Sequence, residues 1–275
     1  MQKQVVLITG ASSGIGEAAA IRLHKKGFTV YAGARRVEKM RHLEQAGIHL
    51  LALDVSDDGS MQDAVAHIIA QEGRIDVLIN NAGYGSYGAL EDVPLSEGKY
   101  QFEVNVFGLA RLTQLALPYM RNNQSGKIVN ISSIGGRTHE PLGSWYHATK
   151  YAVEGMSDCL RLELKDMGID VIIIEPGGVK SEWSGIASDS LLKVSGHTAY
   201  RKLAVMNAKL MASSGGSTSD PDVVARTIEK SLLAKKPKTR YLTGSFARFF
   251  IFMRFVLTDR GYDRFHMFIT TRMAK

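Results

Sequence analysis

Short apolar runs alternate with longer amphipathic stretches over the first two thirds of the chain, and this alternation restricts the fold more than any other feature. The runs are rich in Val, Ile and Leu and lack polar alternation, which is typical of strands buried on both faces. The predicted strands are residues 5–9, 29–33, 49–54, 77–80, 127–131 and 171–175. The predicted helices are residues 14–26, 37–45, 60–71, 96–121 and 145–167.

This order of elements predicts an α/β fold with a parallel sheet and helices on both of its faces. Right-handed crossovers leave few topologies, and the doubly wound, Rossmann-type sheet is the one expected. Gly27 and Gly168 stand where a left-handed residue would end a helix. We expect the 275 residues to form a single domain. Its expected parts are a core over 1–180, a lid over 181–219 and a tail over 245–275.

Net charge is distributed unevenly along the chain. The whole sequence carries +7, whereas residues 235–275 contain ten Lys or Arg and two Asp and carry +8. The rest therefore carries −1, which argues against a nucleic-acid-binding domain. The only cysteine is Cys159, which we expect to be a small buried side chain rather than a nucleophile. A lone cysteine and an opening apolar run of only five residues, 5–9, favour a cytoplasmic location.

A glycine-rich turn joins the first predicted strand to the first predicted helix. It has the spacing G-x-x-x-G-x-G and lacks the Gly-Lys-Ser/Thr of a P-loop. Glycines at such a turn let the backbone approach a diphosphate, and the helix N-terminus adds N–H groups and a positive dipole. The alternative is an ordinary tight turn. The residues expected to contact a dinucleotide are Gly10, Ser12, Ser13, Gly14, Ile15 and Gly16.

The end of the second predicted strand bears on the choice of cofactor. A carboxylate there would bind an adenosine 2′-hydroxyl and select NAD, but the chain has Arg35 and Arg36. Two guanidiniums suit a 2′-phosphate, so NADP(H) is predicted, with Arg35 as the main contact and Arg36 as support. Two solvated arginines are the alternative. Asp54, with Val55 beside it, is expected to accept from the adenine amino group, or else to serve as a turn residue of the 54–58 loop.

Tyr146 and Lys150 are four positions apart, so on a helix they share one face, one turn apart. A nearby ammonium favours the phenolate and lowers the pKa of a tyrosine from about 10. Tyr146 would then be a general acid or base near neutral pH. The alternative is a surface pair on a helix, because Tyr-x-x-x-Lys alone is a weak signal.

Several motifs occur in one fixed order along the chain, each weak alone but highly specific in combination. After the glycine turn they are Asn80-Asn81-Ala82-Gly83, Asn105, Ile131-Ser132-Ser133, Tyr146-x-x-x-Lys150 and Pro176-Gly177. Over residues 4–181 the chain thereby resembles the short-chain dehydrogenase/reductase family. The resemblance implies an NADP(H)-dependent oxidoreductase that interconverts a carbonyl and an alcohol.

The resemblance also implies a role for each catalytic residue. Tyr146 would exchange a proton with the carbonyl or alcohol oxygen, and Ser133 would hydrogen-bond the same oxygen. Lys150 would lower the pKa of Tyr146 and bind the nicotinamide ribose hydroxyls. Asn105 would hold a water that links Lys150 to solvent. Ser132 competes with Ser133 for its role, and is otherwise a strand-end hydroxyl that bonds the backbone.

Further cofactor contacts are implied at the ends of the fourth and sixth predicted strands. The residues after the fourth strand would lie beside the adenine ribose, and those after the sixth strand beside the nicotinamide. The family often has Thr five positions after the proline, whereas this chain has Ser181, which keeps the hydroxyl. The contacts implied are Asn81, Ala82, Gly83, Tyr146, Lys150, Pro176, Gly177, Val179 and Ser181.

The polar residues around Tyr146 have plainer expected roles. His147 should serve packing or a subunit contact. His139 and Glu140 are expected on an exposed loop, with substrate contact as the alternative. No His/Cys/Asp/Glu cluster has metal-ligand spacing, so no metal is expected.

Residues 181–219 form a long connection, which in a compact domain is typical of a lid. Its Leu and Met content predicts an apolar substrate. The family resemblance implies that this substrate is lipid-, steroid- or retinoid-like. Trp183 would line the pocket or anchor the lid, while Tyr84 and Tyr87 would flank the opposite side. The expected members of the lid's apolar surface are Leu191, Leu192, Leu203, Met206 and Met211.

Residues 246–257 of the tail are mostly apolar, rich in Phe, and interrupted by two Arg. This run is too short to span a bilayer. We expect a C-terminal helix that covers the lid or forms a subunit interface. Peripheral contact of residues 245–270 with a membrane is the alternative. A homodimer or homotetramer through helices 96–121 and 145–167 is implied by the resemblance.

Three other functions compete with the reductase. They are a dinucleotide-binding regulator without turnover, a membrane-peripheral protein whose tail matters more than its site, and an epimerase or dehydratase acting on a sugar nucleotide. The complete set of Ser133, Tyr146 and Lys150 argues against the regulator. The short, apolar C-terminal part argues against the epimerase, which needs a larger polar substrate domain.

Overall fold

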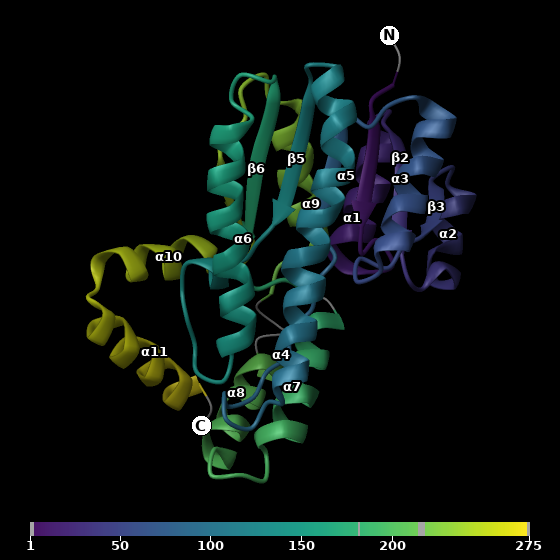
Figure 1. Cartoon of the computed structure of the whole chain (residues 1–275). Helices are drawn as coiled ribbons and strands as arrows, with labels where there is room; N and C mark the ends of the chain where they lie inside the picture. Colours follow the sequence, from purple (N-terminus) through teal and green to yellow (C-terminus); the bar gives the residue numbers. More distant parts are fainter. Residues whose placement is uncertain (1–2, 181, 214–217, 274–275) are drawn as a thin grey trace.

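The computed structural model describes residues 3–180, 182–213 and 218–273 (Figure 1). Its centre is one seven-stranded sheet with the order β3-β2-β1-β4-β5-β6-β7, and every neighbouring pair is parallel. The order runs outward from β1 in both directions, so the predicted doubly wound α/β fold is confirmed. The strands are β1 (Val5–Thr9), β2 (Thr29–Ala34), β3 (His49–Ala52), β4 (Val77–Asn80), β5 (Gly126–Ile131), β6 (Ile169–Pro176) and β7 (Arg240–Thr243).

All six predicted strands are present; β2, β3, β5 and β6 differ from the prediction at their ends, and one further strand was missed. β3 ends at Ala52 rather than at 54, because residues 54–57 turn toward the next helix. β6 is longer than predicted at both ends. The prediction missed β7, since its four residues are only partly apolar and its first three are half-buried at the sheet edge.

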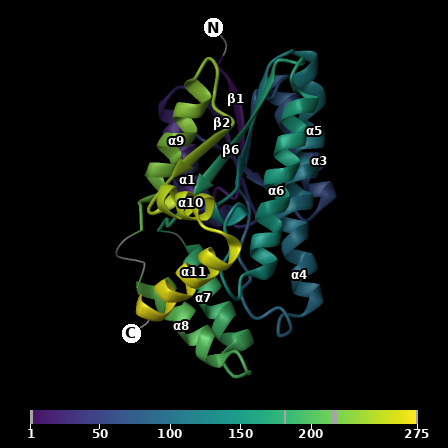
Figure 2. The ribbon, with the colours of Figure 1, turned by 90° about the vertical axis from the view of Figure 1, so that its left-hand side faces the viewer.

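Helices cover both faces of the sheet (Figure 2). One face packs against α1 (Gly14–Lys25) and α9 (Pro221–Leu233), in a core cluster that includes Ala19, Leu23, Val224 and Ile228. The other face packs against α3 (Asp58–Glu72), α5 (Gly108–Asn122) and α6 (Ser144–Glu163). Short helical segments η1 (Val37–Met40) and α2 (Arg41–Gln45) connect β2 to β3.

The largest differences among the helices concern two predicted segments. The segment predicted as 96–121 is α4 (Leu95–Phe102), a π-helical turn η2 (Glu103–Phe107) and then α5. α6 ends at Glu163 rather than at 167, and turns lead from there to Gly168. Gly27 and Gly168 have positive φ values of 96° and 71°, as their positions predicted.

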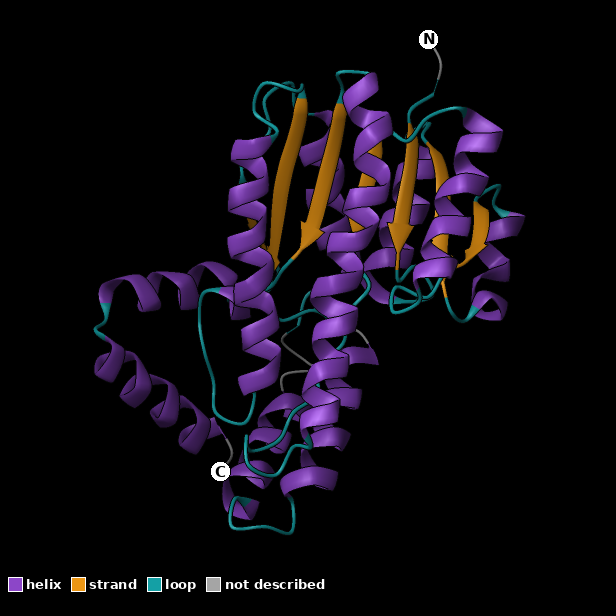
Figure 3. Cartoon of the chain, in the orientation of Figure 1, coloured by secondary structure: helices purple, strands orange, loops and turns teal. Residues whose placement is uncertain are grey.

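The C-terminal part adds helices beyond the carboxyl ends of the strands, toward which the strand arrows point in Figure 3. The predicted long connection contains α7 (Glu182–Ser195) and α8 (Arg201–Ser213). The tail forms α10 (Ala247–Val256) and α11 (Asp259–Met273), which lie to one side in Figure 1. Among the described residues, no helix has the length and apolar character needed to cross a membrane.

Candidate active site

Thr9 and Asn81 hold the glycine-rich turn against the loop that follows β4. Thr9 Oγ1 accepts from the main-chain N–H groups of Asn81 at 3.0 Å and Ala82 at 2.9 Å. Asn81 Nδ2 donates to the carbonyls of Thr9 at 2.9 Å and Gly10 at 3.2 Å. Gly10 has a φ of 66°, and a Cβ there would lie 2.9 Å from Ala82 Cα. Only glycine fits this position, so the turn keeps its main chain open. Sequence reasoning missed Thr9.

The turn and the start of α1 suit a diphosphate. A Cβ on Gly16 would lie 2.5 Å from the carbonyl oxygen of Gly10, so the helix starts directly against the turn. Ser13 is the N-cap of α1, but its side chain makes no capping hydrogen bond. The first N–H groups of the helix therefore have no capping side chain as acceptor, and such groups bind anionic oxygens. Gly14 has a φ of 60°, and Ile15 packs against the core beneath.

Arg35 and Arg36 directly follow β2. Arg36 Nη2 donates to Ser12 Oγ at 3.2 Å, so one guanidinium reaches the glycine-rich segment itself. Arg35 is exposed, and its Nη1 donates to Tyr100 Oη at 3.2 Å. Arg36 therefore borders the turn and Arg35 directly precedes Arg36 in the chain, and two guanidiniums at this place suit a 2′-phosphate.

Asp54 and Val55 occupy the loop after β3. Asp54 Oδ1 accepts from the Ser56 N–H at 2.9 Å and from the Ser56 hydroxyl at 2.7 Å. This geometry matches the turn-residue alternative, and the predicted adenine contact of Asp54 stays a prediction. Val55 is buried and packs under Gly108, where a Cβ would lie 2.2 Å from the Val55 carbonyl oxygen.

Ser133 and Tyr146 come together at the carboxyl end of β5. Ser133 caps the short turn η3 (Ile134–Gly136), and its Oγ accepts from the Gly135 N–H at 3.0 Å. Burial raises the pKa of Tyr146 to about 12, a hydrogen bond from Ser133 opposes the rise, and the charge of Glu140 adds to it. The Ser132 hydroxyl is buried without a hydrogen-bond partner among the described residues. Of the two candidate serines, Ser133 is therefore the one that contacts the phenol.

Lys150 lies on the same face of α6 as Tyr146, with its ammonium buried. Its Nζ donates to the carbonyl of Ile131 at 2.8 Å. Burial lowers the pKa of Lys150 to about 8, against the opposing charge of Glu154. The expected lowering of the pKa of Tyr146 is not found in this structure, because desolvation of the phenol outweighs the other contributions.

Asn105 sits in the π-helical turn η2, a feature frequent at functional sites. Its Oδ1 accepts from the Tyr84 N–H at 3.0 Å, and its Nδ2 donates to the Tyr84 carbonyl at 2.9 Å and to Thr149 Oγ1 at 3.1 Å. A Cβ on Gly83 would lie 3.1 Å from Asn105 Oδ1 and 3.9 Å from Lys150 Nζ. The loop after β4, the π-turn and the catalytic helix thus meet at one point.

The segment after β6 borders the site from the other side. Pro176 ends β6, and the Gly177 N–H donates to the Thr243 carbonyl at 2.8 Å. A Cβ on Gly177 would lie 2.2 Å from the Ser245 carbonyl oxygen, so the chain after β7 packs directly against this segment. Val179 is half-buried against the core. Ser181 lies outside the described residues.

A buried polar cluster behind Tyr146 was not predicted as a unit. The Tyr87 hydroxyl donates to Glu140 Oε1 at 2.7 Å, and its ring centroid lies 5.7 Å from that of Tyr146. His147 Nε2 is 3.8 Å from Glu140 Oε1, and His266 Nε2 is 3.9 Å from Glu140 Oε2. Burial would raise the pKa of Glu140, but contacts with His147 and Tyr87 lower it below its usual value. Tyr146 is therefore packed against the ring of Tyr87, whose hydroxyl bonds a carboxylate that a C-terminal histidine also faces.

The expectation that His139 and Glu140 form an exposed loop was partly right: their side chains are 42 % and 31 % exposed, but α11 packs over this loop. His139 Nε2 lies 2.9 Å from Asp263 Oδ1, and its ring is 5.0 Å from that of Tyr262, which is almost fully buried. His147 serves packing, since its Nδ1 bonds the Gly135 carbonyl at 2.8 Å. The contact between His139 and α11 was not predicted from the sequence, because the two segments are far apart in the chain.

The lid and Tyr146 belong to one hydrophobic cluster. Leu142 and Tyr87 join it from the core, while α7 and α8 contribute apolar residues, with Leu203 and Met211 packed at its border. Leu192, by contrast, is 41 % exposed, so only part of the predicted apolar surface turns inward. The buried lid members are Ala187, Leu191, Ala204 and Ala208.

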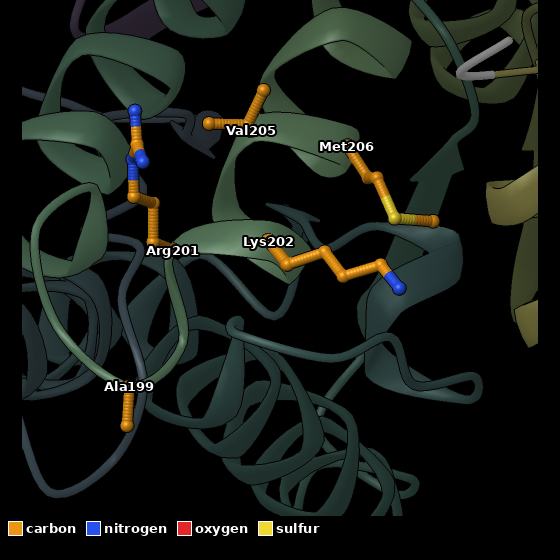
Figure 4. A pocket seen from close by; sticks show the side chains of 5 residues that line it. All are labelled: Ala199, Arg201, Lys202, Val205 and Met206. Carbon is orange, nitrogen blue, oxygen red and sulfur yellow. The ribbon is translucent and has the colours of Figure 1, made fainter.

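A hollow on the outer surface of the lid is separate from this cluster. Ala199, Arg201, Lys202, Val205 and Met206 line it, all from α8 and the turn before it. In Figure 4 the side chains of Arg201 and Val205 extend to one side of the helix and those of Lys202 and Met206 to the other. None of these residues borders Tyr146 in the cluster above, so we do not assign this hollow to the catalytic site.

The expectation of a buried Cys159 was wrong, since this residue is exposed. α6 buries Val153 and Ser157 on one side. Cys159 is two residues after Ser157, so on a helix it lies on the opposite side. The described residues contain no group of three or more His, Cys, Asp or Glu side chains that could hold a metal ion.

Comparison with known proteins agrees with this architecture. A family model described as short chain dehydrogenase matches residues 4–190. The 3-ketodihydrosphingosine reductase of Bacteroides thetaiotaomicron is 44 % identical over 178 residues, which are 64 % of each protein. The NADPH-dependent 3-dehydrocapnine reductase of Ornithobacterium rhinotracheale is 32 % identical over 94 % of each. A short-chain dehydrogenase structure from Streptomyces avermitilis is 35 % identical, with a TM-score of 0.80 over 91 % of both chains. The chain therefore belongs to the short-chain dehydrogenase/reductase family of oxidoreductases.

Proposed function

We propose that this protein is an NADPH-dependent reductase of a ketone carried on an apolar, lipid-like substrate. The observation that carries the proposal is the hydrophobic cluster in which Tyr146 packs with Leu142 and the inner residues of the lid. A substrate that reaches this phenol would lie against apolar side chains of the cluster, and such surroundings bind the hydrocarbon body of a substrate.

The chemistry assigns one task to each side chain of the site. Tyr146 donates its phenolic proton to the carbonyl oxygen as negative charge develops there, and Ser133 donates a second hydrogen bond to the same oxygen. Lys150 lies one helical turn away and would favour the phenolate that forms in the reaction, while in this structure it does not lower the pKa of Tyr146. Asn105 fixes the loop at Tyr84 and, through Thr149, the helix that carries Lys150. When bound, the nicotinamide cofactor supplies the hydride.

Several residues are proposed to bind the cofactor. The turn from Gly10 to Gly16 and the start of α1 would hold the diphosphate. Asn81 and Gly83 would border the adenosine ribose, and Gly177 the nicotinamide. Val179 and Ser181 complete the predicted contacts.

The preference for NADPH over NADH follows from Arg35 and Arg36. No carboxylate stands at the end of β2 to select a free 2′-hydroxyl, and the two guanidiniums stand there instead, one of them at the turn. The name of the Ornithobacterium relative, which matches 94 % of this chain, states NADPH dependence. These two observations support NADP(H) as the cofactor.

Relatives also support the choice of substrate class. The name of the Bacteroides relative denotes reduction of a ketone on a sphingoid base, a substrate with a polar head and a long apolar chain. That division suits a site with polar groups at Ser133 and Tyr146 and apolar lid residues beyond them.

We further propose a homodimer or homotetramer in the cytoplasm. Exposed apolar side chains occur on the π-turn and on α6, where the family resemblance predicted subunit contacts. Phe107, Tyr151 and Leu162 are 55 %, 45 % and 70 % exposed. Exposed apolar side chains on two adjoining helical segments favour burial against a second subunit.

The substrate proposal is tested by following NADPH oxidation with three kinds of ketone: a long-chain 3-keto amino base, a ketosteroid and a short hydroxyketone. We expect the highest kcat/KM for the long-chain base. Leu203→Gln, at the border of the lid cluster, should lower kcat/KM for that ketone about tenfold and leave the short ketone nearly unchanged. A preference for the short polar ketone would contradict the proposal.

A further inference from the structure

We propose that the outer face of α10 and α11 binds the surface of an anionic phospholipid bilayer. This inference concerns the tail alone and holds whatever ketone the active site reduces. It rests on exposed aromatic side chains, on arginines without acidic partners and on the way the two helices are fixed to the core.

Three phenylalanines form an apolar stripe along α10. Phe249, Phe252 and Phe255 are 48 %, 60 % and 86 % exposed. They are three residues apart, so on a helix they lie along one side. Phe268 of α11 adds a fourth ring, which is 59 % exposed. Bulky apolar side chains left outside the core at this spacing are typical of a helix that lies in a membrane interface.

The inner sides of the same helices are packed against each other and the core. The ring centroid of Phe265 lies 6.3 Å from that of Phe250, and 5.9 Å from that of Phe249, which stands at the border between the packed side and the exposed stripe. Tyr262 is almost fully buried and contacts His139. The tail therefore has a fixed inner side, and the stripe on its outer side is part of a structured surface (Figure 2).

Both acidic residues of the tail are already paired. Asp259 Oδ1 lies 2.7 Å from Arg254 Nη2, and Asp263 Oδ1 lies 2.9 Å from His139 Nε2. Other arginines of the tail are exposed and have no ion pair among the described residues; these are Arg248, Arg260, Arg264 and Arg272. The guanidinium of Arg272 lies 5.6 Å above the Phe268 ring, so cation and apolar group share one surface.

An anionic bilayer complements this surface in both respects. Arginines attract acidic headgroups, while phenylalanines enter the boundary between headgroups and acyl chains. A second copy of the chain is a poorer partner, because a symmetric contact would bring the same unpaired arginines together. Among the described residues no helix can cross a membrane, so the contact would be peripheral.

Flotation of the full-length protein with vesicles tests the proposal. Vesicles of phosphatidylcholine with 30 mol% phosphatidylglycerol should carry the protein upward in a density gradient, and vesicles of phosphatidylcholine alone should carry much less. Raising the salt concentration should release it, since screening weakens attraction between exposed charges. Equal binding to both kinds of vesicle, or to neither, would overturn the proposal.

Two double variants separate the charges from the rings. Arg260→Gln with Arg264→Gln should weaken binding to the anionic vesicles roughly 10- to 30-fold, at about fivefold for each arginine. Phe252→Ser with Phe255→Ser should weaken it by at least tenfold. Matched controls outside the tail are Arg121→Gln with Lys165→Gln, and Leu233→Ser, all at exposed positions, which should bind as the wild type does.

A third measurement does not depend on disruptive changes. In a Cys159→Ser background, a cysteine replacing Phe255 is labelled with an environment-sensitive dye, and a second protein carries the label in place of Leu233. The dye at 255 should shift to the blue on adding anionic vesicles, while the dye at 233 should not. Absence of the shift at 255 would overturn the proposal. If the wild type also bound no vesicles and the phenylalanine variant lost an oligomer that the wild type forms, the face would be assigned to a second copy instead.

Discussion

The cofactor end and the substrate end of the active site are built from different parts of the polypeptide. At the cofactor end the turn around Gly10 and Gly16 offers main-chain groups, and side chains such as Thr9 and Asn81 hold the loops in place. At the substrate end the environment of Tyr146 is made by side chains from the lid and α11. The first end depends on local geometry and the second on contacts between distant segments.

This difference predicts two kinds of mutational effect. Changes near the glycine turn should alter cofactor affinity and leave the proton chemistry intact. Changes in the cluster behind Tyr146 should alter pH dependence and substrate choice, with little effect on cofactor affinity. The reacting atoms lie where the two ends meet, so the largest effect is expected there.

Tyr146→Phe should have the largest effect. The variant keeps the ring but removes the proton that Tyr146 would donate, so kcat should fall about 10²- to 10⁴-fold. Binding of NADPH, followed by fluorescence titration, should change less than about twofold, because the cofactor end is untouched. Tyr151→Phe, on the same helix but exposed, is the matched control and should remain active. A Tyr146→Phe variant that reduces the ketone at the wild-type rate would remove the proton donor from the mechanism.

Arg35→Ala and Arg36→Ala test the cofactor end. Each guanidinium would make charge-assisted hydrogen bonds to a 2′-phosphate, worth about 1.5–3 kcal/mol, so the Kd for NADPH should rise roughly 10- to 100-fold. The Kd for NADH should stay within about twofold of the wild-type value. In the control Arg41→Ala, on neighbouring α2, the Kd values for NADPH and for NADH should both stay within about twofold of the wild-type values. Equal weakening of NADPH and NADH would show that the arginines support the turn rather than recognise the phosphate.

The contrast between the two ends also explains what the sequence could reveal. The strands around Gly10 and Asn81 were predictable because buried parallel strands are continuous apolar runs and the glycines follow them directly. Tyr146 and Lys150 were found by spacing and Ser133 through the family resemblance, and the structure brings the three together at the end of β5.

The surroundings of Tyr146 were not predictable in the same way. Glu140 faces His266 across 126 positions of the chain, and no local pattern links them. The raised pKa of Tyr146 likewise comes from burial by distant segments. Exposed Cys159 shows a smaller failure: helix membership was predicted, but its side of the helix depended on the neighbouring elements.

Glu140→Gln tests the substrate end through pH dependence. The charge of Glu140 contributes to the raised pKa of Tyr146, so its removal should lower that pKa. As a proton donor Tyr146 is active below its pKa, and the alkaline fall of kcat/KM should therefore move to lower pH, by about one unit. Gln keeps an oxygen that can accept from the Tyr87 hydroxyl, so the cluster should remain packed.

The matched control for this experiment is Asp58→Asn, which removes an exposed carboxylate on α3. Its pH profile should overlay that of the wild type. A shift of the alkaline limb to higher pH in Glu140→Gln would contradict the assigned direction. An unchanged profile would show that Tyr146 does not set the alkaline limb.

Asp263→Asn should have the smallest effect, although it lies in the contact that joins the tail to the active-site loop. Its partner His139 is 42 % exposed and Asp263 itself 59 %, and ion pairs this open to solvent contribute between zero and about 1 kcal/mol. Thermal unfolding should therefore shift by less than about 4 °C. Tyr262→Ala one position earlier removes a buried ring and should cost about 3–5 kcal/mol. If Asp263→Asn proved as destabilising as Tyr262→Ala, the tail would be held by charge rather than by packing, and the substrate end would depend on ionic strength in a way that the cofactor end does not.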